Sequence, residues 1–194
     1  MTEQDKQEAF GRRMANILNT GALNLAMAVG YRTGLFEAMA SFSVPRSAAA
    51  IAAQSGLNAR YVREWLGVMF TGDVVELVIG EDGIERYLLP PEHAAFLVKS
   101  TGNANLAVYT QEIPLLTACA MEPVIRAFQT GEGVPYSVYP RFQAFMSELA
   151  QCQAPAGPAG EVPAIGGGRP SDGAAEPKAF GSAIWAAAKG WRCC

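Results

Sequence analysis

Hydrophobic residues recur at helical spacing in the first well-patterned segment of the chain, Phe10 to Phe36. The apolar positions that carry the pattern are Phe10, Met14, Ile17, Leu18, Leu25, Ala28, Val29 and Leu35. Gly21 and Gly30 interrupt them, and because glycine weakens a helix we predict a break or kink near one of the two. The segment is more apolar than a solvated surface helix, which favours burial against other helices or against a partner chain.

The next pattern predicts two short helices joined by a tight turn. Ser47 is a suitable N-cap for a helix over Ala48–Gln54, and Gly56 is placed to end that helix. Asn58 can cap a second helix over Ala59–Phe70. Two helices separated by a short turn that contains glycine form a helix-turn-helix arrangement.

A β-hairpin is predicted directly after the second helix. Gly72 and Asp73 end the helix, and the runs Val74–Ile79 and Ile84–Leu89 have the composition of strands. The Asp82-Gly83 pair between them is a strong hairpin-turn signal. A helix-turn-helix followed at once by a hairpin is the winged-helix pattern.

The remaining segments up to residue 150 read as helical. Pro91 can occupy the first turn of a short helix over Glu92–Val98. Asn103–Thr130 is a long apolar helical region that we expect to be interrupted at Pro114 and Pro123. Gly131 and Gly133 end that region, and a last helix is predicted around Phe142–Leu149. The predicted fold is therefore mainly α with a small β-hairpin: a winged helix-turn-helix with flanking helices.

The composition changes abruptly near residue 150. Of the 44 residues from Gln151 to Cys194, Ala, Gly and Pro supply 24, so this tail cannot bury enough apolar area to offset its chain entropy, and we expect it to be disordered. Three explanations stay open for such a tail: a reading-frame shift near residue 150, a genuine short isoform, or a natural linker. The chain then divides into residues 1–40, a helical dimerisation segment; 41–100, the winged helix; 101–150, a helical extension; and 151–194, the tail.

Charge and cysteine content narrow the class of protein. The formal net charge is -3, which lacks the basic excess typical of nucleic-acid binders and gives no electrostatic reason for membrane attachment. The polar, acidic N-terminus is no secretory signal, and the four cysteines lack metal-ligand spacing. We therefore expect a cytoplasmic protein with no metal site and with neither DNA nor a membrane as partner.

Two arginines on the second predicted helix nonetheless leave a DNA-binding interpretation open. We expect one face of that helix to carry Tyr61, Trp65, Val68 and Met69, and the other side to carry Arg60, Arg63 and Glu64. Arg60 and Arg63 could contact DNA as a recognition helix does, and the alternative function is a winged-helix transcriptional regulator. No further Lys or Arg supports them and Glu64 and Glu76 are close in sequence, so a solvated, neutralised face is the expected outcome.

Four motifs in order resemble one bacterial family. These are RTGLF (32–36), NARYVREWLGVM (58–69), LPPEHAAFL (89–97) and GVPYSVYPRFQAFMSE (133–148). Together they resemble the S-adenosylmethionine-dependent methyltransferases that carry an N-terminal winged-helix domain, over roughly Phe10 to Glu148. The resemblance implies that the winged-helix part packs on a partner subunit and roofs the substrate cavity, while a following doubly wound α/β domain holds the cofactor.

The sequence departs from that family after Glu148. Its one glycine cluster, Gly166–Gly168, has no strand before it and a proline after it, so we expect no cofactor-binding loop and no catalytic residue in this chain. The expected function is the dimerisation and substrate-cap module of such a methyltransferase, truncated before its catalytic domain and inactive alone. S-adenosylmethionine and a small acceptor would be bound only by a full-length relative. The expected partner is a second copy or a full-length relative, and a pure interaction module pairing through Phe10–Leu35 is a further alternative.

Four residues are candidates for the substrate cap. Tyr136, Tyr139 and Arg141 lie in the aromatic, family-like stretch, where they line the mouth of a cavity or simply pack between helices. His93, the single histidine, could act as a general base, although a histidine beside Pro90 and Pro91 on a short helix is more often structural.

Overall fold

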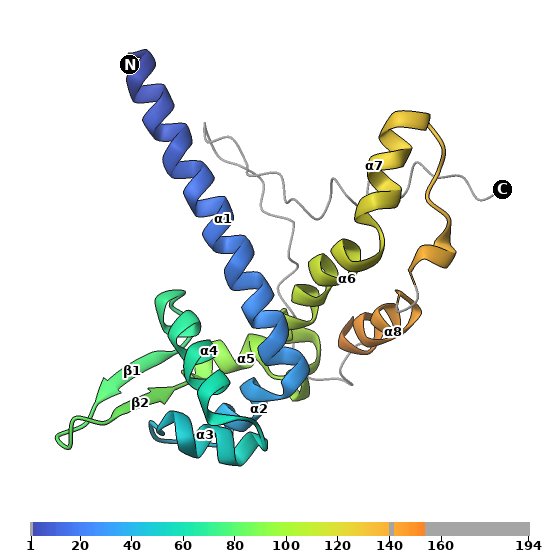
Figure 1. The fold of residues 1–194 in the computed structure, drawn as a ribbon. Helices are drawn as coiled ribbons and strands as arrows, with labels where there is room; N and C mark the ends of the chain where they lie inside the picture. The colour runs from blue at the N-terminus through green and yellow to red at the C-terminus, as the bar shows by residue number, and fades with distance from the viewer. Residues whose placement is uncertain (1, 140–141, 154–194) are drawn as a thin grey trace, which may run out of the picture.

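The computed structural model describes residues 2–139 and 142–153, and it has a helical body from which two features project (Figure 1). One is the N-terminal part of the long helix α1, Glu3–Thr33, and the other is a two-stranded wing. The predicted fold class, mainly helical with one hairpin and a winged helix-turn-helix, is confirmed. The predicted tail lies outside the described residues, apart from the end of the last helix.

Helix α1 is continuous, so the predicted break near Gly21 or Gly30 is wrong. Its N-terminus is closed by a capping box in which Thr2 and Asp5 bond each other's backbone N–H groups. It ends at Gly34, whose φ of 75° is the left-handed conformation that glycine adopts most readily. Gly30 stays helical because the Trp65 ring fills the space beside it, and that packing offsets the intrinsic cost of the glycine.

The helix-turn-helix is built as predicted from α3, Ala48–Ser55, and α4, Ala59–Thr71, preceded by the short α2, Leu35–Ala40. The side chains of Ser47 and Asn58 accept hydrogen bonds from Ala50 N–H and Arg60 N–H. Gly56, at φ 68°, ends α3. These capping residues thus determine where both helices begin and where α3 ends.

The buried stripe of α4 only partly coincides with the apolar face that the sequence indicated. The buried residues are Val62, Trp65, Leu66 and Met69, whereas Tyr61 is 73% exposed and Val68 is also exposed. The core stripe is therefore rotated toward Val62 and Leu66, because α4 is covered by α1 and α3 together rather than by one neighbour.

The wing consists of β1, Glu76–Ile79, and β2, Glu85–Leu88, paired antiparallel with Leu77 opposite Tyr87. Both strands are shorter than predicted. Arg46, just before α3, forms a bridge with Tyr87 on the other side of β2. The wing is thus attached to the body through β2, and β1 is its outer strand.

The C-terminal half is a succession of short helices. They are α5, Pro91–Leu97; η1, Lys99–Ala104; η2, Ala107–Gln111; α6, Glu112–Cys119; α7, Met121–Thr130; η3, Tyr136–Val138; and α8, Phe142–Gln153. The helical region is interrupted as predicted, but not at the prolines themselves. Helix α6 begins two residues before Pro114, and α7 begins two residues before Pro123. A proline in the first turn of a helix removes no intrahelical hydrogen bond, which is why both are tolerated there.

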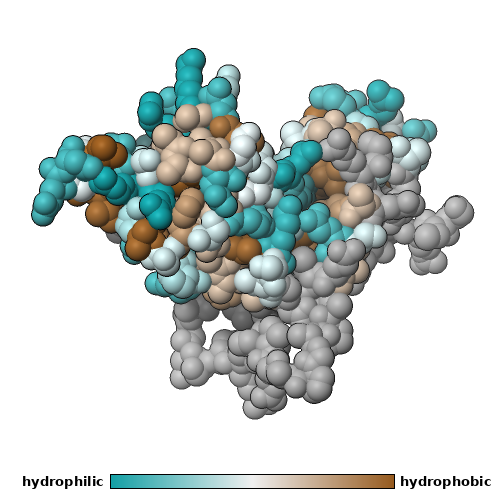
Figure 2. All heavy atoms as spheres, turned by 90° about the horizontal axis from the view of Figure 1, so that it is seen from below, coloured by the Kyte–Doolittle hydropathy of each residue, from teal (hydrophilic) through white to brown (hydrophobic). Residues whose placement is uncertain are grey.

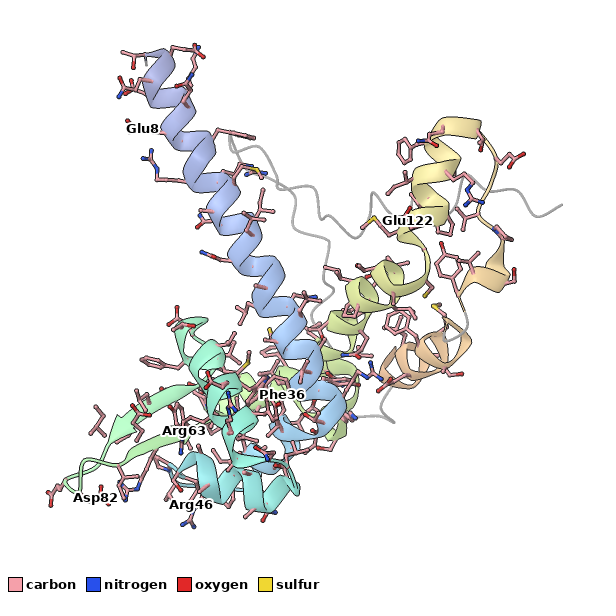
Figure 3. All side chains as sticks on the ribbon, viewed as in Figure 1. Glu8, Phe36, Arg46, Arg63, Asp82 and Glu122 are labelled. Carbon is pink, nitrogen blue, oxygen red and sulfur yellow. The ribbon has the colours of Figure 1, made fainter. Side chains whose placement is uncertain are left out.

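The core joins α1 to the winged helix. Its fully buried side chains include Phe36, Ile51, Leu66, Met69 and Val108. The rings of Phe36 and Trp65 meet edge to face with centroids 5.4 Å apart, and Figure 3 shows Phe36 inside the body. The indole N–H of Trp65 donates to the carbonyl of Ala26 at 2.8 Å, which ties α4 to α1.

Candidate functional site

A cavity of about 480 Å³ lies where the C-terminal end of α1 meets α6 and α8. Its walls are formed by Tyr31, Arg32, Lys99, Gln111, Pro114, Leu115, Ala118, Cys119, Ala144, Phe145 and Glu148. A cavity of this size is in the range of small-molecule sites.

A hydrogen-bonded group at the cavity wall connects three distant parts of the chain. The hydroxyl of Tyr31 donates to Glu148 Oε1 at 2.7 Å and accepts from the side-chain amide of the buried Asn105 at 3.3 Å. The Lys99 ammonium lies 4.7 Å from the centroid of the Tyr31 ring. Because Tyr31 is almost fully buried, its hydrogen bond positions the Glu148 carboxylate beside the cavity, and the exposed Lys99 ammonium lies over the Tyr31 ring.

The two sides of the cavity differ in chemistry. Pro114, Leu115 and Ala118 of α6 and Phe145 of α8 supply an apolar wall, and the carboxylate of Glu148 adjoins it. Such a site fits a molecule with an apolar body and a few polar groups, for which Glu148 offers an acceptor and Arg32 and Lys99 offer donors. The thiol of Cys119 donates to the carbonyl of Leu115 at 2.7 Å, within its own helix, so the wall presents no activated nucleophile.

The predicted cap residues are placed differently from this group. His93 Nδ1 lies 3.0 Å from the backbone carbonyl of Val74, which links α5 to the segment before the wing, and His93 is not among the cavity walls. Tyr139 is half-buried and also lies outside the described wall. Arg141 and the Tyr136 side chain lie outside the described residues. The cap roles of all four stay predictions.

Several residues of the site lie in the family-like motifs, but the sequence does not show that these motifs meet at one cavity. Tyr31 precedes the RTGLF motif and Glu148 closes the last one, 117 residues later. Their pairing depends on how α8 returns to α1, and spacing along the chain cannot reveal it.

A second candidate surface is an apolar stripe on α1. Phe10, Ile17 and Leu18 are 62%, 51% and 67% exposed, and Met14, Leu25 and Val29 are exposed as well. By helical spacing these side chains share one face, with Gly21 in the middle of it. Leu23, Ala26 and Met27, which pack against the core, lie on the opposite face. The described chain therefore leaves this stripe uncovered along the N-terminal part of α1, whereas Ala28, near the end of the same face, is buried.

A similar stripe occurs on α7. Met121, Ile125 and Phe128 follow one another at helical spacing, and all three are exposed, Phe128 to 89%.

The geometry of the described residues does not support the DNA-binding interpretation. In the described part of the chain no ion pair joins Arg60 or Arg63 to a carboxylate, so the predicted neutralisation by Glu64 and Glu76 is not present as direct contacts. The wing, which would adjoin DNA, instead carries four exposed carboxylates, Glu76, Glu81, Asp82 and Glu85. Their charge would repel phosphates. Figure 3 shows Arg63 at the base of the wing and Asp82 at its tip.

One wing carboxylate is held in its ionised form. Arg86 donates to Asp82 at 2.8 Å, and this hydrogen bond, followed by the one from Ile84 N–H, holds the pKa of the Asp82 carboxyl well below its usual range. The wing tip therefore remains charged at any physiological pH.

Neither a metal site nor a membrane span occurs within residues 2–139 and 142–153. No three His, Cys, Asp or Glu side chains gather there in a way that could hold a metal ion. None of the helices in these ranges combines the length and the apolar character needed to cross a bilayer.

Comparisons with known proteins match this geometry. A family model described as the Rv2258c-like winged HTH domain matches residues 21–99. Human N-acetylserotonin methyltransferase, solved with SAM, shares the fold with a TM-score of 0.59 and 15% identity, over 79% of this chain and 46% of its own. The mitomycin 7-O-methyltransferase MmcR gives a TM-score of 0.55 and 17% identity, over 77% of this chain and 46% of its own.

The chain thus spans less than half the length of each of these two enzymes, and at such identities the likeness is one of fold. A comparison with curated proteins finds no match to the sequence. Residues 21–99 therefore match a winged helix-turn-helix domain of the Rv2258c-like type, in a chain that shares its fold with the N-terminal region of S-adenosylmethionine-dependent methyltransferases.

Proposed function

We propose that this chain is the dimerisation and substrate-cap module of an S-adenosylmethionine-dependent methyltransferase. The family of the winged-helix domain and the shared fold support the class of enzyme. The proposed activity of the whole enzyme is methyl transfer from S-adenosylmethionine to a small acceptor. That activity needs a cofactor domain, and we assign no catalytic or cofactor-binding role to any described residue of this chain.

The observation that carries the proposal is the uncovered stripe of α1. With 31 residues, the helix is about 46 Å long, and all residues from Glu3 to Thr20 are exposed. Figure 3 shows Glu8 near the free end, far from the body. An apolar stripe on a projecting helix needs a partner, because isolated helices in water gain most of their stability from packing such a face.

A second copy of α1 fits this stripe well. The stripe is self-complementary in chemistry, and a Cβ added to Gly21 at its centre would meet no atom within 4 Å, so this glycine leaves room for a close helix approach. Burial of each half-exposed aliphatic or aromatic side chain contributes about 1 kcal/mol, since full burial gives about 1.5–3 kcal/mol. Six such side chains from each copy give a gain comparable with the cost of association, roughly 4–15 kcal/mol.

The position of the cavity supports the proposed cap role. Its walls come from the C-terminal end of α1 and from α8, the last described helix. A domain placed after α8 would adjoin the cavity, and an acceptor with an apolar body would lie between the two. The exposed stripe of α7 gives that domain, or a partner subunit, a surface to pack against.

Sedimentation of two matched α1 variants tests the dimerisation role. Ile17→Glu puts a charge at the centre of the stripe, whereas Asn16→Glu puts the same charge on the opposite face of the same turn. We expect a dimer for wild type and for Asn16→Glu, and at least a hundredfold weaker association for Ile17→Glu. A monomeric wild-type protein, or equal effects of the two changes, would contradict the proposal.

Calorimetry tests whether the cofactor site lies in this chain or in another domain. Titration of the chain with S-adenosylmethionine should release no heat of specific binding, because the cofactor site is proposed to belong to another domain. A micromolar dissociation constant would instead locate the cofactor in this chain. If the chain is mixed with a longer relative, a mixed dimer that is detected by mass and is lost with Ile17→Glu would support pairing through the same stripe.

A further inference from the structure

Within the described part of the chain, the outer edge of β1 has backbone groups with no partner. Arg46 N–H donates to Tyr87 carbonyl at 2.9 Å, and Tyr87 N–H donates to Arg46 carbonyl at 2.8 Å. Tyr87 therefore points its backbone groups away from β1, so Leu77, opposite Tyr87, must point its own away from β2. The hydrogen bond from Gly80 N–H to Ile84 carbonyl, 3.1 Å, gives the same alternation at the other end of the strand.

It follows that the N–H and C=O groups of Leu77 and Ile79 face outward. Among the described residues, no backbone hydrogen bond from outside the hairpin reaches either of them. The register of β1 and β2 runs without a bulge, and the strand contains no proline or lysine. This edge therefore lacks most of the devices that usually keep another strand from pairing with it.

Apolar side chains surround this edge. Ile79 is 67% exposed, and Val78 and Ile84 are exposed as well. Figure 2 shows such hydrophobic residues, in brown, among hydrophilic ones on the projecting wing at the left of the view. A strand added here would gain both backbone hydrogen bonds and apolar contact.

The negative charge of the wing indicates which kind of strand could dock at this edge. Glu76 precedes the free edge, and Glu85 lies opposite Ile79 across the hairpin. Glu81 and Asp82 lie in the turn, and Arg86, the single cation between residues 76 and 88, is bonded to Asp82. Two such wings would repel each other, so a second copy is disfavoured, whereas a strand carrying Lys or Arg is attracted.

We propose that the outer edge of β1 is a docking site for an extended, basic segment of a partner protein. The segment adds a third strand to the wing, exchanging hydrogen bonds with Leu77 and Ile79. Its apolar side chains contact Ile79 on one face of the wing, and its cations lie beside Glu76 on the opposite face. The site is independent of the α1 stripe, since the wing and the N-terminal part of α1 project in different directions (Figure 1).

A synthetic peptide with the whole chain tests the proposal. The probe is a labelled seven-residue peptide that alternates lysine and valine, and the control peptide alternates glutamate and valine. We expect fluorescence anisotropy to report binding of the basic peptide only, weakened as salt is raised. Amide chemical shifts should change at Leu77 and Ile79 and not along the α1 stripe.

Two substitutions at one position separate backbone pairing from side-chain contact. Ile79→Pro removes an outward N–H that the hairpin does not use, and edge strands tolerate proline at such positions. Ile79→Ala removes the side chain and keeps the N–H. We expect at least tenfold weaker peptide binding for Ile79→Pro and a smaller loss for Ile79→Ala.

A third measurement leaves the protein unchanged, in case the proline disturbs the hairpin. A basic peptide N-methylated on alternate residues cannot donate along one edge, and we expect one of the two methylation patterns to abolish binding. The proposal is overturned if the basic peptide does not bind at millimolar concentration. It is equally overturned if the acidic peptide binds as well, or if both methylated peptides bind like the parent peptide. It is also overturned if Ile79→Pro forms a smaller oligomer than the wild-type protein does, because the occupant of the edge would then be a second copy of the chain.

Discussion

Gly30 is the position where α1 meets the winged helix most closely, and a single methyl group there provides a sharp test of the packing. A Cβ at Gly30 would overlap Cζ2 of Trp65 and lie 3.0 Å from Cε2 of Trp65 and 3.1 Å from Cε2 of Phe36. Trp65 cannot easily retreat, because its indole N–H bonds the Ala26 carbonyl and its ring meets Phe36 edge to face. The change Gly30→Ala therefore forces a shift in the centre of the core.

The expected magnitude is the difference between two effects. Alanine improves helix propensity by about 1 kcal/mol relative to glycine. Overpacking of a well-filled core costs about 1–3 kcal/mol, and loss of the indole hydrogen bond would add about 1 kcal/mol. We expect Gly30→Ala to lower the free energy of unfolding by about 1–3 kcal/mol.

Gly67 supplies the matched control. It lies in the interior of α4, two residues after Trp65, and a Cβ added there meets nothing within 4 Å. Gly67→Ala should therefore raise the free energy of unfolding by about 0.5–1 kcal/mol. Urea unfolding of both variants at one protein concentration, followed by tryptophan fluorescence, checks the pair. If Gly30→Ala is as stable as wild type or more so, the close contact between α1 and α4 is wrong.

Two further changes test the cavity and its surroundings. Tyr31→Phe removes the hydrogen bond to Glu148 and should cost about 1–2 kcal/mol in urea unfolding, with faster amide exchange in α8; unchanged exchange would mean that this bond does not hold the helix. Burial raises the pKa of the Glu112 carboxyl, so folding disfavours its ionised form and stability increases as pH falls through the raised pKa. Glu112→Gln should therefore be more stable than wild type at pH 7, and thermal melts should show the difference disappearing below the ordinary pKa of 4.5. A difference that persists at low pH would exclude ionisation as its cause.

The winged helix could be predicted because its signals are local. Ser47, Gly56 and Asn58 each act within three or four residues of the helix end they define, and the Asp82-Gly83 turn acts within its own hairpin. Such signals need no knowledge of the distant chain, so helix ends and the wing followed from the sequence to within a few residues.

The errors arose where a distant contact decides the outcome. Gly30 was expected to weaken α1, but Trp65, 35 positions later, fills the place of its missing side chain. Tyr61 and Val68 were expected to share a face of α4 with Trp65 and Met69, but the two neighbouring helices bury Val62 and Leu66 instead of Tyr61 and Val68. The cavity depends on the same kind of contact, because Tyr31 and Glu148 meet only through tertiary folding.

The apolar pattern of α1 was predicted, but its division into two faces was not. Residues 10–29 read as one hydrophobic segment, and only the structure separates Leu23, Ala26 and Met27, which pack on the body, from Leu25 and Val29, which do not. A segment that covers its own domain, and that we propose also pairs with another chain, needs apolar residues on both faces, in keeping with a sequence more apolar than a surface helix. Because apolar residues lie on both faces, the sequence lacks the clear helical periodicity that would identify a single buried face. A substitution such as Ile17→Glu, made beyond the body, therefore separates association from folding, whereas a change at Leu23 would affect the fold itself.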